Sequence, residues 1–184
     1  VVDVTEARQI VRERREARIR YRSLVEAIPA ITYVEHATPD SPQESRFTFV
    51  SPQMEEILGY TPEEATNDLF FFERTLHPDD LERIRAANIR AESTGEPFDE
   101  EFRQITKDGG IRWMHDRSVL VRDDDGAPSF WHGVTIDITA RKEAERSLRL
   151  LEERYRSLVE QIPAVTFIET PGGPPDETWF TYLS

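Results

Sequence analysis

Cysteine is absent from this chain of 184 residues, and its absence excludes several kinds of site. Without a thiol the chain can form no disulfide, no thiolate metal site and no cysteine nucleophile. Photochemistry that proceeds through a cysteine adduct is excluded for the same reason. The function must therefore rest on other side chains.

Long apolar runs and an excess of positive charge are also missing. No stretch approaches the length of a transmembrane helix, and no signal peptide is visible. The formal net charge is −13, which argues against a nucleic acid or an anionic membrane as partner. Hydrophobic residues make up 38% of the chain, enough for a packed core. We expect a soluble, cytoplasmic, globular protein.

One short segment occurs twice, 134 residues apart. YRSLVEAIPAITYVE begins at Tyr21 and YRSLVEQIPAVTFIE begins at Tyr155, with 11 of 15 positions identical. The similarity extends backwards to Val1 and Thr135, and forwards to RFTFVS and WFTYLS after a one-residue gap. Such a period indicates a window cut from a tandem array. We expect the end of a preceding unit at 1–5, a linker helix at 6–28, a complete domain at 29–139, a second linker helix at 140–162 and the start of a following unit at 163–184.

The second linker segment has the pattern of a coiled coil. Leu148, Leu151, Tyr155 and Leu158 recur at steps of three and four between charged residues, which is typical of a two-stranded coiled coil. We call these four residues the dimer seam and expect them to hold a parallel homodimer. The equivalent positions of the first linker include an Arg and an Ala, so that copy is weaker. A single amphipathic helix lying on its own domain is the alternative.

The complete unit reads as strands, then helices, then strands. Two strands are expected at 30–36 and 46–51, followed by three helical pieces and three further strands. Asp108-Gly109 and Asp125-Gly126 lie between β-rich runs and are strong hairpin signals. The order predicts an α+β fold in which one antiparallel sheet carries its helices on one face.

Several motifs in this unit resemble the PAS domain with its PAC-type C-terminal half. They are ILGYTPEE, LHPDDLER, ITKDGGIRWM, RDDDGAPSFWHGVTIDITARK and the linker LEERYRSLVEQIPA. The resemblance covers residues 29–139 and implies a five-stranded antiparallel sheet in the order 2-1-5-4-3, often with a small-molecule pocket. It also implies sensing or dimerisation upstream of an output domain such as a histidine kinase, a diguanylate cyclase or a phosphatase. Fold alone does not name the ligand.

The residues narrow the choice of cofactor. Flavin-binding members that form a photo-adduct use a cysteine, and haem-binding members usually take a His from the long helix. This chain has no Cys, and its long helical segment, DDLERIRAANIRAEST, has no His. We therefore expect no cofactor of these types, and no metal. A flavin bound without an adduct, or another small molecule, remains open.

Three polar or aromatic residues are candidates for the lining of a ligand pocket. Asn88 lies on the apolar face of the long helical segment, where it could enter a pocket or satisfy backbone groups. Trp113 and His132 lie on predicted strands, where a buried His could tune a pocket. His77, in the run His-Pro-Asp-Asp, is better explained as a helix start than as a metal or acid–base group. The sequence shows no set of nucleophile, base and orienting residue, so we expect no enzyme activity.

The junction Asp137-Ile138-Thr139 ends the last predicted strand and begins the second linker helix. In the PAS family this junction transmits signal, with the Asp pairing with basic or amide groups and the Thr capping the helix. We expect these three residues to relay a distortion of the sheet into the helix. The chain then works as a sensory and dimerisation module beside further PAS units and an output domain. The alternative is a ligand-free scaffold that only sets domain spacing.

Overall fold

The computed structural model describes residues 9, 12, 16, 25, 28–36, 46–160, 167–169 and 180–183. The expected preceding unit at 1–5 and nearly all of the first linker helix lie outside these residues. The chain divides into two compact units, Val1–Thr139 and Ala140–Ser184, which are described separately below.

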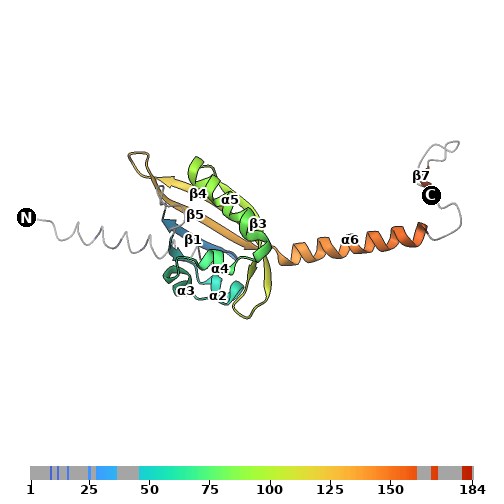
Figure 1. The fold of residues 1–184 in the computed structure, drawn as a ribbon, viewed down its shortest axis with the longest axis horizontal. Coiled ribbons are helices and arrows are strands. Elements are labelled where there is room, and N and C mark those ends of the chain that lie inside the picture. The colour runs from blue at the N-terminus through green and yellow to red at the C-terminus, as the bar shows by residue number, and fades with distance from the viewer. Residues whose placement is uncertain are drawn as a thin grey trace, which may run out of the picture. The chain divides into compact units, whose positions relative to one another are not determined.

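A five-stranded antiparallel sheet forms the centre of the first unit (Figure 1). Its strand order is β2-β1-β5-β4-β3, which confirms the α+β class and the order that the resemblance implied. The strands are β1 (Ile31–His36), β2 (Arg46–Val50), β3 (Phe98–Ile105), β4 (Ile111–Arg122) and β5 (Pro128–Asp137).

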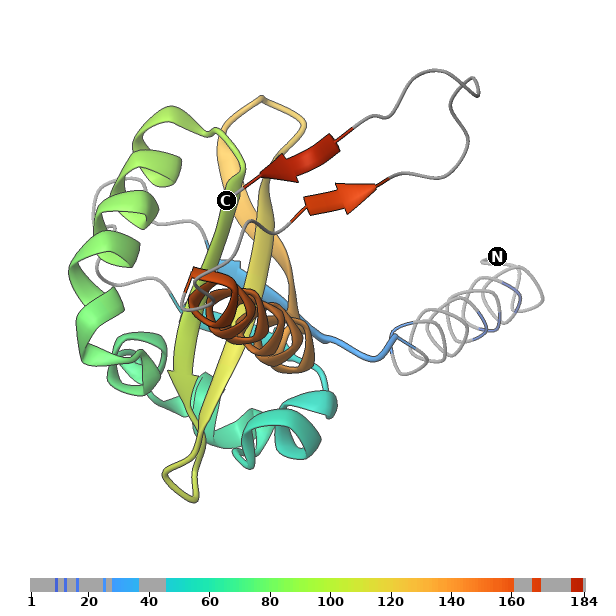
Figure 2. The same ribbon diagram turned by 90° about the vertical axis from the view of Figure 1, so that its right-hand side faces the viewer.

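Four helices connect β2 to β3 and cover one face of the sheet (Figures 1 and 2). They are α2 (Gln53–Leu58), α3 (Pro62–Asn67), α4 (Phe71–Thr75) and α5 (Pro78–Thr94). The sequence predicted three helices here, and that number is wrong because α4 was missed. With five residues, α4 is too short to show a helical period.

The ends of α5 follow from local chemistry. His77 accepts a hydrogen bond from the backbone N–H of Asp79 and Pro78 is the first helical residue, so this His has the structural role expected of it. Gly95 ends the helix with φ of 73°, a left-handed conformation that costs little without a Cβ.

The core lies between α5 and the inner face of the sheet. Ile84 of α5, Phe102 of β3 and Met114 of β4 have no exposed side-chain surface. Along β4 burial alternates, with Met114, Asp116 and Ser118 inside and Ile111, Arg117 and Val119 outside, as the period of a half-buried strand requires. This alternation decides which residues can reach the helices.

The second unit contains a long helix and a small hairpin. The helix α6 spans Thr139–Glu160, close to the linker helix that the sequence predicted, and β6 (Phe167–Glu169) pairs antiparallel with β7 (Phe180–Leu183). The register of this hairpin repeats that of β1 and β2 at the spacing of the sequence repeat. Phe167↔Leu183 and Glu169↔Phe180 correspond to Tyr33↔Val50 and Glu35↔Phe47. Among the described helices none is both long and apolar enough to cross a membrane.

Candidate functional site

A cavity of about 80 Å³ lies between the inner face of the sheet and the segment from α4 to α5. That space exceeds what a single water molecule needs and suits a small ligand. Its lining combines aromatic rings with carboxyl, amide and hydroxyl groups. The lining residues are Tyr33, Glu35, Phe47, Leu69, Phe70, Phe72, Glu73, Asn88, Ala91, Glu92, Phe98, Asp116, Ser118 and Trp131.

A hydrogen bond between two distant strands closes the floor of this cavity. The Tyr33 hydroxyl on β1 lies 3.1 Å from Oδ1 and 3.0 Å from Oδ2 of Asp116 on β4. Strand β5 runs between them, and its residue opposite Tyr33 is Gly133. A Cβ built on Gly133 would overlap the Tyr33 ring. The missing side chain is therefore what allows the ring to cross β5 and reach Asp116.

Asp116 is an acid that its surroundings keep protonated. Burial raises its pKa to about 8, the nearby charge of Glu35 adds to the rise, and the hydrogen bond from Tyr33 opposes it. Burial also raises the pKa of Tyr33 well above its usual value, with further contributions from the charges of Asp116 and Glu35. Near neutral pH the pair is an uncharged phenol and an uncharged carboxylic acid.

Glu92 of α5 is a second carboxyl group with an unusual environment. Its Oε2 atom is buried and has no hydrogen-bond partner among the described residues. Burial raises the pKa of Glu92 to about 7, and the charge of Glu35 adds to the rise. In contrast, Glu73 forms a two-armed pair with Arg85 at 3.1 and 3.0 Å. The two carboxyl groups therefore differ, because a guanidinium group balances the charge of Glu73 whereas no described donor reaches the Oε2 atom of Glu92.

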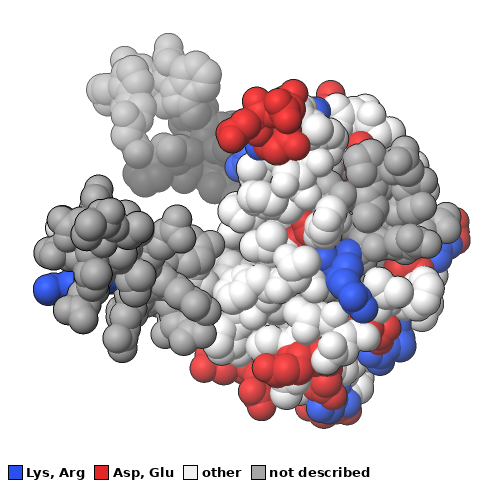
Figure 3. All heavy atoms as spheres, turned by 90° about the vertical axis from the view of Figure 1, so that its left-hand side faces the viewer, with Lys and Arg blue, Asp and Glu red and all other residues white. Residues whose placement is uncertain are grey.

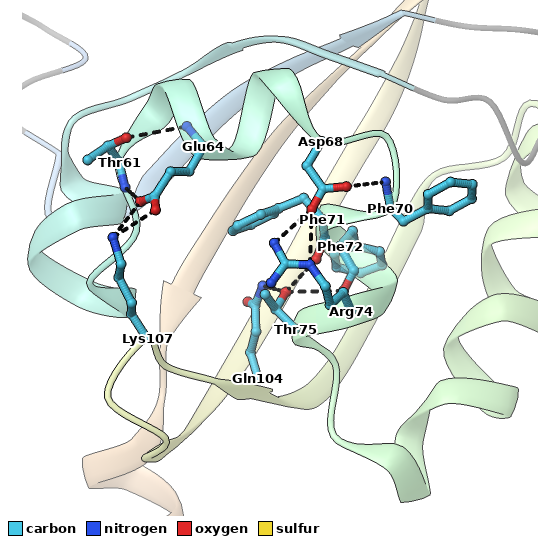
Figure 4. A network of polar contacts seen from close by, with 10 residues as sticks. All are labelled: Thr61, Glu64, Asp68, Phe70, Phe71, Phe72, Arg74, Thr75, Gln104 and Lys107. Carbon is cyan, nitrogen blue, oxygen red and sulfur yellow. Dashed lines mark hydrogen bonds and ion pairs between the residues drawn. The ribbon is translucent and has the colours of Figure 1, made fainter.

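A polar network holds the segment that carries the aromatic wall (Figure 4). Thr61 and Glu64 form a capping box at the start of α3, and Lys107 of the β3–β4 turn bonds Glu64 at 2.7 Å. Asp68 accepts from the Phe70 backbone N–H at 3.0 Å and from Arg74 at 2.7 Å. These contacts fix the turn that places Phe70 at the cavity.

The short helix α4 is tied to β3 by buried hydrogen bonds. Gln104 donates to the Thr75 hydroxyl at 2.8 Å, and that hydroxyl lies 2.9 Å from the carbonyl oxygen of Phe71 (Figure 4). The backbone N–H of His77 then donates to the carbonyl of Arg103. The position of α4, and with it Phe72, is therefore set by β3.

The structure places one of the three candidate pocket residues in the cavity. Asn88 lines it, on the same face of α5 as Ala91 and Glu92. Trp113 and His132 lie on the outer face of the sheet, and assigning them to a pocket was wrong. Side chains alternate between the two faces along a strand, and the neighbours of Trp113 and His132 face inward, so these two residues face outward. His132 is exposed.

Tyr33, Asp116 and Glu92 were missed from the sequence, although signals for two of them exist. Asp116 lies two residues after Met114 on β4 and therefore faces the same side of the sheet. An Asp at a buried position of a strand is uncommon. Glu92 follows Asn88 by four residues and so shares its helical face. The bond from Tyr33 to Asp116 depends on strand pairing and could not be found from periodicity.

Hydrogen bonds connect the strand–helix joint (residues 137–139) to the neighbouring strand β4. Asp137 accepts from the backbone N–H of Thr139 at 2.8 Å and lies 3.5 Å from Arg112. The Thr139 hydroxyl accepts a hydrogen bond from the backbone N–H of Trp113 at 3.0 Å. Ile138 donates to the Trp113 carbonyl at 2.8 Å. The joint is thus fastened to β4.

The four residues of the dimer seam lie on α6 with their side chains largely exposed. Their exposed fractions run from 57% for Leu148 and Leu158 to 63% for Leu151. Leu150 on the same helix is 56% exposed but lies off the seam. An apolar stripe of this kind is typical of a helix that pairs with another helix.

Charge is distributed unevenly over the surface. Figure 3 shows a broad uncharged area on one face, with acidic side chains gathered in groups near its edge and fewer basic ones. The described residues on this face form no continuous basic patch that would suit a nucleic acid. Among the described residues no three acidic or imidazole side chains converge as a metal site would require.

Comparisons with known proteins match the domain just described. Residues 47–135 match a family model described as PAS fold. The chain is 35% identical to the methyl sulfide methyltransferase-associated sensor of Methanosarcina acetivorans, over 62% of this chain and 11% of that protein. It is also 35% identical to sensor protein FixL of Bradyrhizobium diazoefficiens, over 58% of this chain and 21% of that protein. The chain therefore spans only a small part of these relatives.

Among solved structures, a sensory box histidine kinase/response regulator from Burkholderia thailandensis is similar. Its TM-score is 0.56 at 26% identity, and the match covers 75% of this chain and 98% of that one. The N-terminal domain of a diguanylate cyclase with PAS/PAC sensor from Marinobacter aquaeolei matches with a TM-score of 0.54 at 23% identity, over 61% of this chain and 98% of that one. The second likeness concerns the fold alone.

Replacing Asp116 by Asn should change how stability depends on pH. An unfolded Asp titrates near pKa ~3.9, whereas folded Asp116 has a pKa of about 8. Between these values the folded state keeps a proton that the unfolded state loses, so the free energy of unfolding falls as pH rises. Relative to the wild type, Asp116→Asn should gain at least about 1.4 kcal/mol between pH 5 and pH 9 in urea unfolding. Asp124→Asn at an exposed turn is the control, and parallel curves for Asp116→Asn and wild type would contradict the expectation.

Gly133→Ala should destabilise the domain through the Tyr33 ring. The new methyl group must displace that ring, at a cost of about 1–3 kcal/mol in the free energy of unfolding. In a Tyr33→Ala background the clash disappears, so the second substitution should cost much less. Denaturant unfolding of the two single variants and the double variant measures this coupling. His132→Ala, on the exposed side of the same strand, is the control, and additive effects of the first two changes would disprove the contact.

Proposed function

Because residues 47–135 belong to the PAS fold family, we propose that this chain is a sensory and dimerisation module of a multi-domain signalling protein. In this proposal the cavity binds a small molecule, and the strand–helix joint relays the resulting change to α6. The module itself is not an enzyme and works in the cytoplasm.

The observation that carries the proposal is the cavity with its converging polar groups. Asn88, Ser118 and Glu92 reach it from two different elements, between aromatic walls. A pure spacer has no need for polar groups in a hollow core, because buried polar atoms cost stability unless they are satisfied. A few polar groups among apolar walls are typical of a ligand site.

The relay is supported by the hydrogen bonds of the strand–helix joint. Trp113 exchanges bonds with Ile138 and Thr139, so β4 and the start of α6 cannot shift independently at this point. Asp116, which faces the cavity, lies three residues further along β4. A displacement of β4 by a ligand would therefore change the geometry at Thr139.

A parallel homodimer follows from the dimer seam. Burying a Leu side chain contributes about 1.5–3 kcal/mol, so two facing seams can offset the cost of association. Parallel pairing brings the ends of both helices to the same side, where identical output domains can meet.

Further PAS units and an output domain complete the proposed protein. The matching register of the β6–β7 and β1–β2 hairpins supports a second PAS unit that begins in 163–184. Two relatives have names that describe sensors, and one solved relative is a histidine kinase/response regulator. A kinase as output is consistent with these names, and a diguanylate cyclase or a phosphatase is the alternative that the resemblance implies.

Filling the cavity separates a sensor from a ligand-free scaffold. Ala91 is buried in the cavity wall on α5, whereas Ala86 on the same helix is exposed. In a sensor, Ala91→Leu should alter hydrogen exchange of the backbone amides of Trp113, Ile138 and Thr139, measured by NMR, while Ala86→Leu should leave them unchanged. A scaffold predicts that the exchange of these three amides is unchanged in both variants. That second outcome would reject the relay.

Charges in the dimer seam should separate the protomers. A Leu151→Glu, Leu158→Glu double variant places like charges in the contact, so we expect monomers in light scattering with the domain still folded by circular dichroism. Leu150→Glu adds a charge at a similarly exposed position off the seam and should remain dimeric. A fully dimeric double variant would place the contact elsewhere, for example on the outer face of the sheet.

A further inference from the structure

Among the described residues, the cavity is lined by acidic side chains and by no basic one. Among the described lining residues four carry carboxyl groups, and none is Lys, Arg or His. Glu73 is balanced by Arg85, and Asp116 is bound by Tyr33. Among the described residues no basic side chain pairs with Glu92, so this acid contributes negative charge to the cavity. An anionic ligand would have to be buried against like charge, which is unfavourable.

Glu92 adds a hydrogen-bond requirement to this charge. Its Oε2 atom is inaccessible to solvent and has no donor within the described part of the chain. Buried acceptors are normally satisfied, and a carboxylate is satisfied best by a charged N–H donor. Asn88 lies one helical turn before Glu92 and lines the same cavity, so its amide oxygen can accept a second N–H.

The aromatic walls suit the same kind of ligand. Six of the lining residues are Phe, Tyr or Trp, whose ring faces attract cations. Phe70 is 61% exposed and Leu69 is 44% exposed, so both lie at the mouth of the cavity. Figure 4 shows the Phe70 ring pointing away from the network of Asp68 and Arg74. Among the described residues, no Lys, Arg or His lines this wall.

We propose that the cavity binds a small organic cation, a primary amine in its ammonium form, with Glu92 and Asn88 accepting its N–H groups and the aromatic wall packing on its carbon chain. The proposal rests on the proposed function, in which this cavity is the ligand site. It adds the chemical class of the ligand. The small volume favours a short aliphatic chain over a large ring system.

Three probes of nearly equal size test the charge class. We would titrate the full chain with n-butylamine, n-butanol and butyrate by calorimetry at pH 8, where Glu92, with a pKa of about 7, is ionised. The ammonium form of n-butylamine should bind at least about tenfold more tightly than n-butanol, and butyrate should not bind. Chemical shift changes of the Asn88 and Glu92 amides would locate the site.

Two matched variants test whether Glu92 binds the amine. Glu92→Gln removes the charge with little change in shape and should weaken n-butylamine binding about tenfold or more. Glu96→Gln removes a charge from an exposed position four residues further on and should bind as the wild type does. Circular dichroism and thermal unfolding verify that both variants are folded.

Several outcomes would overturn the inference. Tighter binding of n-butanol or butyrate would assign the cavity to a neutral or anionic ligand and leave the sensory proposal intact. Equal binding of n-butylamine to wild type and Glu92→Gln would remove Glu92 from the site. Absence of binding by all three probes would reject a small amine. The sensory proposal fails separately, through unchanged exchange in Ala91→Leu, because that experiment uses no ligand.

Discussion

The cavity depends on one side chain crossing a neighbouring strand. Tyr33 on β1 reaches Asp116 on β4 only because Gly133 leaves the intervening strand β5 without a side chain at that point. The contact locks three adjacent strands in one register, since a shift by one residue would turn every inward side chain outward. It also sets the floor of the cavity, on which Ser118 and Trp131 lie. A buried hydrogen bond that spans three strands thus positions the groups that a ligand would meet.

Carboxyl groups of this domain have different surroundings, which shift their pKa values in opposite directions. On α5, Asp80 accepts three hydrogen bonds from Arg103, and these hold its pKa below the usual range, so it stays charged and joins α5 to β3. Among the described residues no basic side chain pairs with Asp116 or Glu92, and burial raises the pKa of each. A protein gains no stability from such buried, unbalanced acids. Strongly perturbed groups of this kind cluster at functional sites, which separates the cavity from the structural ion pairs.

Much of the fold could be predicted from local chemistry, and much of the site could not. The Asp-Gly turns and the alternation of the strands lead to the hairpins, and Pro78 and Gly95 lead to the ends of α5. The helix α4 was not predicted because its five residues are positioned by the hydrogen bond from Gln104 to Thr75, which joins residues 29 apart in sequence. The same limit explains Trp113 and His132, which were assigned to the pocket by residue type. Their strand parity, which the sequence does contain, places them on the other face.

Strand β4 links the cavity to the long helix without any further element. Asp116 faces inward on this strand, and three residues earlier the backbone of Trp113 is bonded to Ile138 and to the Thr139 hydroxyl. In the proposed relay, a displacement at Asp116 would be carried along β4 to Trp113. The Thr139 hydroxyl accepts a hydrogen bond from β4, and Asp137 accepts one from the backbone N–H of Thr139. Thr139, the first residue of α6, is therefore bonded to both β4 and β5, and these bonds give the proposed relay its physical basis.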